Sequence, residues 1–254
     1  MEWGFFTPAH IISLIAAAAM NIALYFAVRN RSQKVQIAVL TVFSLTGIAA
    51  VLFHLLRWGC PLQNLPLHLC SINALLLPIA VVTRNKTIGN LLLVWCLGAL
   101  VALVLNFEVA TTELFGETFI FYYFPHVFEF GIPILLFKLK LVNKDVRCIG
   151  TTLGLTMLIY TFVHLCNKLI NLLCQTYGIL NPSGHVIHVN YMFSLQPNNP
   201  LTAWFQELVP FEYWYMYMVL PIAGVYLLGV YAPEIWAAYR RRQGVKKMQK
   251  KIAV

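Results

Sequence analysis

A cysteine, a histidine and a glutamate in this sequence are of the types that carry out covalent acyl chemistry: Cys70, His126 and Glu129. A thiol near an imidazole can act as a nucleophile, because the imidazole takes its proton and the thiolate attacks a carbonyl carbon. His126 and Glu129 are three residues apart, so on a helix they share one face and the carboxylate can orient the ring. These residues predict a nucleophile, a general base and an orienting acid. The plainer interpretation of Cys70 is a small buried hydrophobe.

Further polar residues accompany these three in a chain that is otherwise strongly apolar. Two histidines, His68 and His164, are additional candidates for the catalytic role. The candidates for holding a substrate, by stabilising an oxyanion or contacting a phosphate, are Asn73, Asn167, Lys168, Asn171, Asn190 and Tyr191. The alternative is that these side chains only form hydrogen bonds between helices and so stabilise a bundle.

The histidines and cysteines do not follow the spacing of known metal sites. The sequence contains no HExxH-like pair and no CxxC pair. We therefore expect neither a metal ion nor another cofactor.

The composition predicts the environment in which these residues lie. The chain of 254 residues is 60% hydrophobic and only 11% charged, and its mean hydropathy is +0.73. Soluble domains carry about 25% charged residues, so this chain predicts an integral membrane protein. Its net charge of +9 comes largely from a basic C-terminal stretch. Contact with anionic lipid headgroups explains that stretch, and we expect no nucleic-acid partner.

Seven apolar stretches are long enough to cross the hydrocarbon core, which takes about 20 helical residues each. All but two of the 18 basic residues, Arg57 and Lys168, fall on one side of these stretches, which predicts an external N-terminus and a cytoplasmic C-terminus. The fold class is therefore an all-α polytopic membrane protein, with residues 1–239 as one seven-helix domain and 240–254 as a basic cytoplasmic tail. The one long loop, 178–212, is expected to be external. The predicted spans are 8–28, 36–56, 66–83, 88–107, 118–139, 148–174 and 213–239.

This topology places the polar residues toward the outer side of the membrane. His126 is expected about 12 Å below the outer end of its helix, with Glu129 near the midplane. A carboxylate at that depth needs compensation, which we expect from Lys168, from a histidine or from a bound proton. The predicted feature is a polar cavity open to the outer leaflet.

Three blocks of this sequence resemble a known family in the same order. Residues 65–71 (LPLHLCS) resemble the signature of the small bacterial integral-membrane proteins of the YwaF type, and residues 122–126 (YYFPH) and 190–193 (NYMF) resemble two further blocks. The resemblance runs from about residue 10 to residue 221. It implies a multi-pass protein of the bacterial plasma membrane.

More distantly, the sequence is similar to a eukaryotic transmembrane acyltransferase family that acts on ether phospholipids. There an Asn-Pro-Cys-His block supplies a catalytic cysteine and a Tyr-Tyr-x-x-His block a catalytic histidine. His126 falls on that histidine and His68 on the histidine of the first block, whereas the cysteine position is occupied by Leu67. Cys70 lies three residues further on, on about the same helix face. The resemblance implies that the partner is a membrane phospholipid.

These observations favour a membrane-embedded enzyme that modifies lipids by acyl transfer or ester cleavage. The alternative is a transporter or a lipid-binding accessory protein without catalysis, because Pro133 and Pro221 can interrupt helices as gating elements do. A purely structural membrane protein is the third hypothesis.

Overall fold

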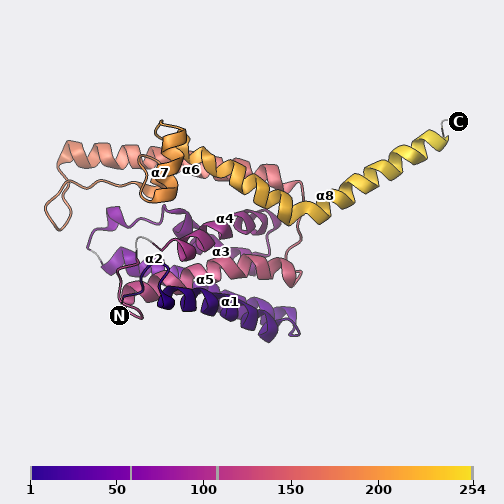
Figure 1. Cartoon of the computed structure of the whole chain (residues 1–254), viewed down its shortest axis with the longest axis horizontal. Coiled ribbons are helices and arrows are strands. Elements are labelled where there is room, and N and C mark those ends of the chain that lie inside the picture. The colour runs from indigo at the N-terminus through magenta and orange to yellow at the C-terminus, as the bar shows by residue number, and fades with distance from the viewer. Residues whose placement is uncertain (1, 58, 107–108, 253–254) are drawn as a thin grey trace.

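The computed structural model describes residues 2–57, 59–106 and 109–252, and these ranges form a helical bundle (Figure 1). Within them no strand forms, and isolated bridges join Glu2 to Glu113 and Leu180 to Val186. The helices are α1 (Pro8–Val28), α2 (Gln33–Arg57), α3 (Leu69–Thr83), α4 (Lys86–Val104), α5 (Glu117–Lys138), α6 (Cys148–Tyr177), α7 (Pro200–Leu208) and α8 (Val219–Ile252). Three short 3₁₀ turns, η1 (Pro61–Gln63), η2 (Tyr191–Phe193) and η3 (Trp214–Met218), complete the secondary structure of the described residues.

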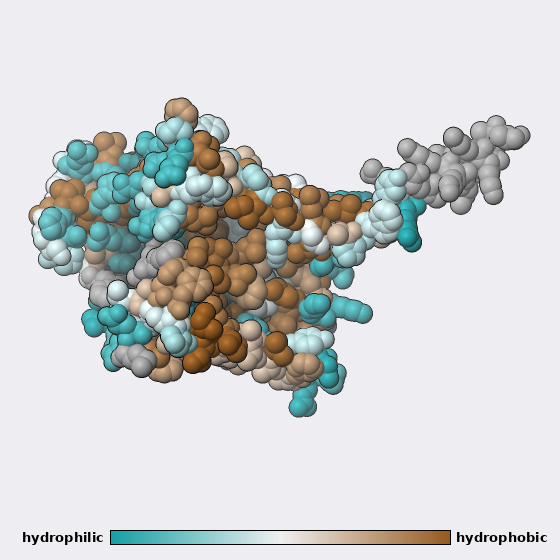
Figure 2. Space-filling model, in the orientation of Figure 1, coloured by the Kyte–Doolittle hydropathy of each residue, from teal (hydrophilic) through white to brown (hydrophobic). Residues whose placement is uncertain are grey.

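The helices have the lengths and hydropathy of a multi-pass membrane protein. Six of the described segments are long and apolar enough to cross a bilayer: α1, α2, α4, α5, α6 and Trp214–Ala237. Helix α3 is apolar but has only 15 residues, about 22 Å of helix, which is shorter than a hydrocarbon core of about 30 Å. Figure 2 shows a hydrophobic band over the middle of the bundle and hydrophilic residues toward its ends, as expected of a membrane-spanning protein.

The start of α3 differs from the sequence prediction, which had the span begin at Pro66. The helix begins at Leu69, and His68 is its extended N-cap residue with φ −72° and ψ 153°. The reason is a long-range contact, because the Leu65 N–H donates to the Tyr191 hydroxyl at 3.2 Å. Residues 65–68 are therefore used to hold a distant loop and do not continue the helix.

The other boundaries agree with the prediction within a few residues, except at the last helix. The predicted span 213–239 begins with the 3₁₀ turn η3, and α8 then continues to Ile252 (Figure 1). The predicted separate tail, 240–254, is thus helical and continuous with α8 as far as Ile252. Residues 253–254 of that tail lie outside the described residues.

The helices form two groups in Figure 1, with α1 to α5 in one and α6, α7 and α8 in the other. Helix α5 is the centre of the first group, because it packs against α1, α2, α3 and α4. Helix α6 packs mainly on α4, and most of its surface stays exposed. The candidate catalytic residues of α3 and α5 therefore lie inside the first group. The polar residues of α6 lie in the second group.

Gly131 on α5 allows a polar side chain of α1 to approach closely. Asn21 donates to the carbonyl oxygens of Ala17 at 3.1 Å and Val127 at 3.0 Å. A Cβ atom at position 131 would lie 1.6 Å from Oδ1 of Asn21. The amide could move only by breaking these two hydrogen bonds.

We predict that Gly131→Ala destabilises the bundle by about 1–3 kcal/mol, the usual range for overpacking. The measurement is the thermal unfolding temperature of the purified protein in detergent. The matched control is Gly150→Ala on α6, where a Cβ would meet nothing within 4 Å, so that the better helix propensity of alanine should leave stability unchanged or slightly higher. Equal unfolding temperatures for the two variants would contradict the close contact.

Candidate functional site

The buried polar centre of the bundle joins α3 to α5. Nδ2 of Asn73 donates to Oε2 of Glu129 at 3.5 Å, and both side chains are buried. Gly47 of α2 faces the same carboxyl group, since a Cβ there would lie 3.3 Å from Oε1 of Glu129. One expectation was that Lys168 compensates the charge of Glu129. It does not, because its Nζ pairs with Glu212 at 2.6 Å.

The contacts of Glu129 favour its neutral form. An ionised carboxylate is costly to bury beside a neutral amide, and among the described residues the hydrogen-bond partner of Glu129 is the Asn73 amide. Oδ1 of Asn73 is a buried acceptor with no hydrogen-bond partner among the described residues. A protonated Glu129 would bring a donor close to this acceptor, so we expect the carboxyl group to carry a proton.

His126 is held one turn further toward the start of α5, and the contact that orients it comes from Tyr122. Nδ1 of His126 lies 2.6 Å from the Tyr122 carbonyl oxygen, and the two rings pack with centroids 4.3 Å apart. A carbonyl oxygen only accepts, so Nδ1 must carry the hydrogen and Nε2 keeps the lone pair. The ring therefore presents Nε2 as a base.

The packing of α3, α4 and α5 predicts that Cys70 and His126 lie at the same level of the bundle. These helices follow one another along the chain and α4 packs against both others, so successive passages make α3 and α5 parallel. The contact between Asn73 and Glu129 fixes their relative height. Three residues earlier on each helix, about one turn, are Cys70 and His126. The structure thus brings Asn73 and Glu129 together, and this register predicts that Cys70 and His126 lie in the adjacent layer.

A search of protein-family models gives a match over most of the chain. The model of the TMEM164 family matches residues 5–231. The chain belongs to the TMEM164 family. No curated protein and no solved structure matches it. The family is one of transmembrane proteins, and the finer resemblances, to the YwaF type and to the ether-phospholipid acyltransferases, remain predictions.

The matched TMEM164 region includes a loop segment that lies along α6, residues 189–196, which we call the strap. Asn167 donates to the Tyr191 carbonyl and to Ser194 Oγ, both at 2.9 Å, and accepts from the Tyr191 N–H at 3.0 Å. Asn171 donates to the Val189 carbonyl at 2.9 Å and accepts from its N–H at 2.7 Å. These two amides were predicted to bind substrate. In the structure they form hydrogen bonds with the strap, to its backbone and to the Ser194 hydroxyl.

Two more of the predicted residues also serve the strap. Oδ1 of Asn190 accepts from the Leu195 N–H at 3.0 Å, and its Nδ2 donates to the Gln196 carbonyl at 2.8 Å. The Tyr191 hydroxyl donates to the Leu62 carbonyl, and burial raises the pKa of Tyr191 to about 12. The strap is therefore tied both to α6 and to the segment that precedes α3.

His68 joins the strap to the N-terminus of α3 in this TMEM164-family protein. Its Nδ1 accepts from the Met192 N–H at 3.4 Å, and burial lowers the pKa of His68 to about 4. Its ring also contacts the rings of Tyr191 and Phe193. His68 is thus neutral at physiological pH, and its observed contacts are with the strap.

We predict that stability falls between about pH 6.5 and pH 4 through His68. The unfolded chain binds a proton on this histidine below pH 6.5 and the folded chain resists it until about pH 4, so the stabilising contribution is present at high pH and lost as pH falls. In His68→Asn, whose Oδ1 keeps an acceptor without titrating, the unfolding temperature should fall less between pH 7 and pH 4. Equal pH dependence in the two proteins would exclude His68 as a cause.

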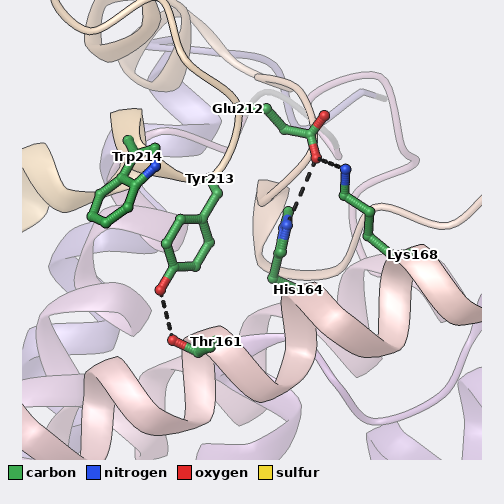
Figure 3. Close-up of a pocket in the computed structure, with 6 residues that line it drawn as sticks. All are labelled: Thr161, His164, Lys168, Glu212, Tyr213 and Trp214. Carbon is green, nitrogen blue, oxygen red and sulfur yellow. Dashed lines mark hydrogen bonds and ion pairs between the residues drawn. The ribbon is translucent and has the colours of Figure 1, made fainter.

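A second polar cluster lies between α6 and the segment before α8 (Figure 3). Oε1 of Glu212 lies 2.6 Å from Lys168 Nζ and 3.7 Å from His164 Nε2. Thr161 Oγ1 and the Tyr213 hydroxyl share a hydrogen bond of 2.7 Å. With Trp214, these residues line an open cavity of about 510 Å³, which we call the cleft. His164 also contacts Ser194 of the strap at 3.1 Å, so it belongs with the cleft and the strap.

Sequence reasoning missed Glu212 and Tyr213 as site residues. Glu212 directly precedes the predicted last span, 213–239, and Tyr213 is the first residue of that span. The available signal was the position of Lys168 on α6, because an amine in an apolar helix predicts an acidic partner.

The opposite end of the bundle carries polar contacts that connect its helices. Lys86 pairs with Asp145, and this hydrogen bond lowers the pKa of Asp145. Lys144 donates to the Val230 carbonyl at 2.8 Å and lies 3.7 Å from Glu234. These contacts tie the loop between α5 and α6 to α4 and α8. In the part of the chain that the structure describes, no group of three His, Cys, Asp or Glu side chains is arranged to hold a metal ion.

Proposed function

We propose that this TMEM164-family protein is a membrane-embedded enzyme that transfers or cleaves acyl chains of phospholipids. Cys70 is the nucleophile and His126 the general base. The observation that carries the proposal is the contact of Asn73 on α3 with Glu129 on α5. It supports a register in which the Cys70 thiol is level with His126, whose Nε2 is the basic nitrogen.

The chemistry follows from these two groups. Nε2 of His126 takes the proton of the Cys70 thiol, and the thiolate sulfur bonds to the ester carbonyl carbon of the lipid. The bond from that carbon to the alcohol oxygen breaks, and the leaving oxygen takes the proton from His126. An acyl thioester on Cys70 and a lysophospholipid result. The acyl group then passes to water or to a lipid hydroxyl, whose proton returns through His126 to the sulfur.

Asn73, Glu129 and Tyr122 have positioning roles in this proposal. The Tyr122 carbonyl fixes the tautomer and direction of the His126 ring. In catalytic histidines the partner of the non-reacting ring nitrogen commonly has this role. Glu129, held neutral beside Asn73, sets the height of α5 against α3. The contact of Asn73 with Glu129 is buried and that of His126 with Tyr122 is partly buried, so both hold the helices and the ring in place inside the bundle.

The proposed topology has seven passages, with α3 as the short one, an external N-terminus and a cytoplasmic C-terminus. The distribution of basic residues supports this orientation. The site then lies toward the outer leaflet, where a lipid ester can reach it from the side, and the membrane is the bacterial plasma membrane that the YwaF resemblance implies.

The test is lipid turnover by the purified protein in vesicles of defined phospholipids, followed by mass spectrometry. We expect lysophospholipid together with free fatty acid or an acyl-exchanged lipid, above the level in empty vesicles. Lipid that stays bound to the protein but is not converted would instead support the alternative, a lipid-binding accessory protein without catalysis.

A further inference from the structure

The cleft presents charges of both signs to its cavity and is built by residues other than those of the proposed catalytic site. Lys168 and Glu212 are 55% and 44% exposed at their side chains, so their ion pair remains accessible. A second cavity of about 400 Å³ adjoins the first, since Lys168 and Glu212 line both. Together they offer a space of the size that small-molecule ligands occupy, about 300–1,000 Å³.

The positive and negative groups of the cleft come from different elements and pair with one another. His164 and Lys168 project from α6 and are four residues apart, so they lie on the same face of the helix. Glu212 comes from the segment before α8. In Figure 3 the rings of Tyr213 and Trp214 lie to one side of the Glu212 carboxylate and Lys168 to the other. His164 lies between them, because it is close to the Glu212 carboxylate and its ring centroid is 4.8 Å from that of Tyr213.

The aromatic rings form a connected group next to His164, whose ring contacts that of Tyr213. The Tyr213 ring lies 5.1 Å from Trp214, 5.3 Å from Tyr217 and 5.1 Å from Tyr160, between centroids. The Trp214 ring lies 5.3 Å from that of Tyr217. Aromatic faces attract cations, and tryptophan does so most strongly. Aromatic rings that line the same cavity as a carboxylate are a suitable environment for an ammonium group.

We propose that the cleft binds a zwitterionic phosphate ester, with its phosphate against Lys168 and His164 and its ammonium group against Glu212, Tyr213 and Trp214. A phosphate alone would face the Glu212 carboxylate, and an ammonium ion alone would face Lys168. A molecule that carries both charges replaces the internal ion pair with two favourable ones. The ligand is either a soluble amino-alcohol phosphate or the headgroup of a lipid. The inference does not depend on the chemistry proposed for Cys70 and His126, because the two sites share no residue.

The experiment uses the full chain purified in a maltoside detergent and titrates it calorimetrically with four probes. These are phosphocholine, phosphoethanolamine, inorganic phosphate and choline chloride. We expect at least one of the two zwitterions to bind about tenfold or more tightly than either single-charge probe. Lys168→Met and Glu212→Gln should each weaken that binding by about tenfold or more, the effect of one charged hydrogen bond.

A matched control separates the cleft from other exposed ion pairs. Glu117 pairs with Arg57 at 3.3 Å, and Glu117→Gln should leave zwitterion binding unchanged. The double exchange Lys168→Glu with Glu212→Lys keeps an ion pair but reverses the two ends of the cleft. Its unfolding temperature should lie within a few degrees of that of the wild type, and its affinity for the zwitterion should fall about tenfold or more. This variant therefore tests the proposal even if the single variants do not fold.

Three results would overturn the proposal: inorganic phosphate binding as tightly as the zwitterions, the exchanged variant binding like the wild type, or no binding of any probe. A short-chain phosphatidylcholine, added below its micellar concentration, distinguishes the source. Binding of this lipid about tenfold or more tightly than phosphocholine identifies a lipid headgroup, and equal affinity identifies a soluble phosphate ester. Both of these outcomes support the zwitterion site.

Discussion

The variant His126→Asn should turn over phospholipid acyl chains about 10²- to 10⁴-fold more slowly than the wild type, the usual contribution of a general base. Asparagine retains a donor that can reach the Tyr122 carbonyl, which accepts from His126 in the native structure, but it has no nitrogen that can take the thiol proton. The measurement is the initial rate of lysophospholipid formation in reconstituted vesicles. A variant that keeps the wild-type rate would remove His126 from the reaction.

The matched control for this variant is His185→Asn, which changes an exposed histidine of the long loop. It should retain full turnover. The purely structural interpretation of His126 makes a different prediction, namely that His126→Asn lowers the unfolding temperature and that the residual rate follows the fraction of folded protein. Unchanged stability with lost turnover favours the catalytic role.

Cys70→Ala should abolish acyl turnover above the background of empty vesicles, because no other group in the proposed mechanism carries the acyl chain. Removing the nucleophile of a comparable catalytic group costs about 10⁶-fold in rate. Cys70→Ser should leave at most a small residual rate, since a hydroxyl is a weaker nucleophile than a thiol at neutral pH. The rates are measured by lipid mass spectrometry on equal amounts of folded protein.

The control for the cysteine is Cys166→Ala on α6, where the thiol is similarly half-buried. This variant should behave as the wild type. A membrane-permeable maleimide should inactivate the wild type and Cys166→Ala alike. Full activity of Cys70→Ala would show that the thiol is a bystander and that the TMEM164-family protein works by another mechanism.

The helices could be predicted from the sequence wherever local signals determine them. Residues Pro8–Val28 of α1 match the predicted span, because Thr7 caps the helix and Pro8 suits its first turn. The start of α3 could not be predicted, since Leu65 and His68 contact the strap more than 120 residues further along the chain. The extension of α8 past Tyr239 was missed because the basic residues there were interpreted as a separate tail.

The site shows the same division between local and long-range information. The relative depths of Cys70, Asn73, His126 and Glu129 follow from helical rise alone, and the contact of Asn73 with Glu129 agrees with them. The partner of Lys168 did not follow, because α6 packs mainly on α4 and pairs with the segment before α8. Which helix neighbours which is a tertiary property that spacing along one helix does not specify.

The role of the amides on α6 illustrates a further limit of residue types. Asn167 and Asn171 have the groups needed to hold a phosphate, yet in the fold they hold backbone groups of the strap. An unpaired backbone N–H or C=O near the bilayer is costly, so an irregular segment there needs such partners. A polar stripe on a membrane helix therefore predicts either a ligand or an irregular segment of the same chain.

The most direct measurement of the central claim is the intact mass of the protein after brief incubation with a phospholipid of one defined acyl chain. We predict a fraction of protein heavier by one acyl group, with the group on Cys70, released by hydroxylamine and absent from Cys70→Ala. Continued turnover by a protein that never carries an acyl group on Cys70 would contradict the account.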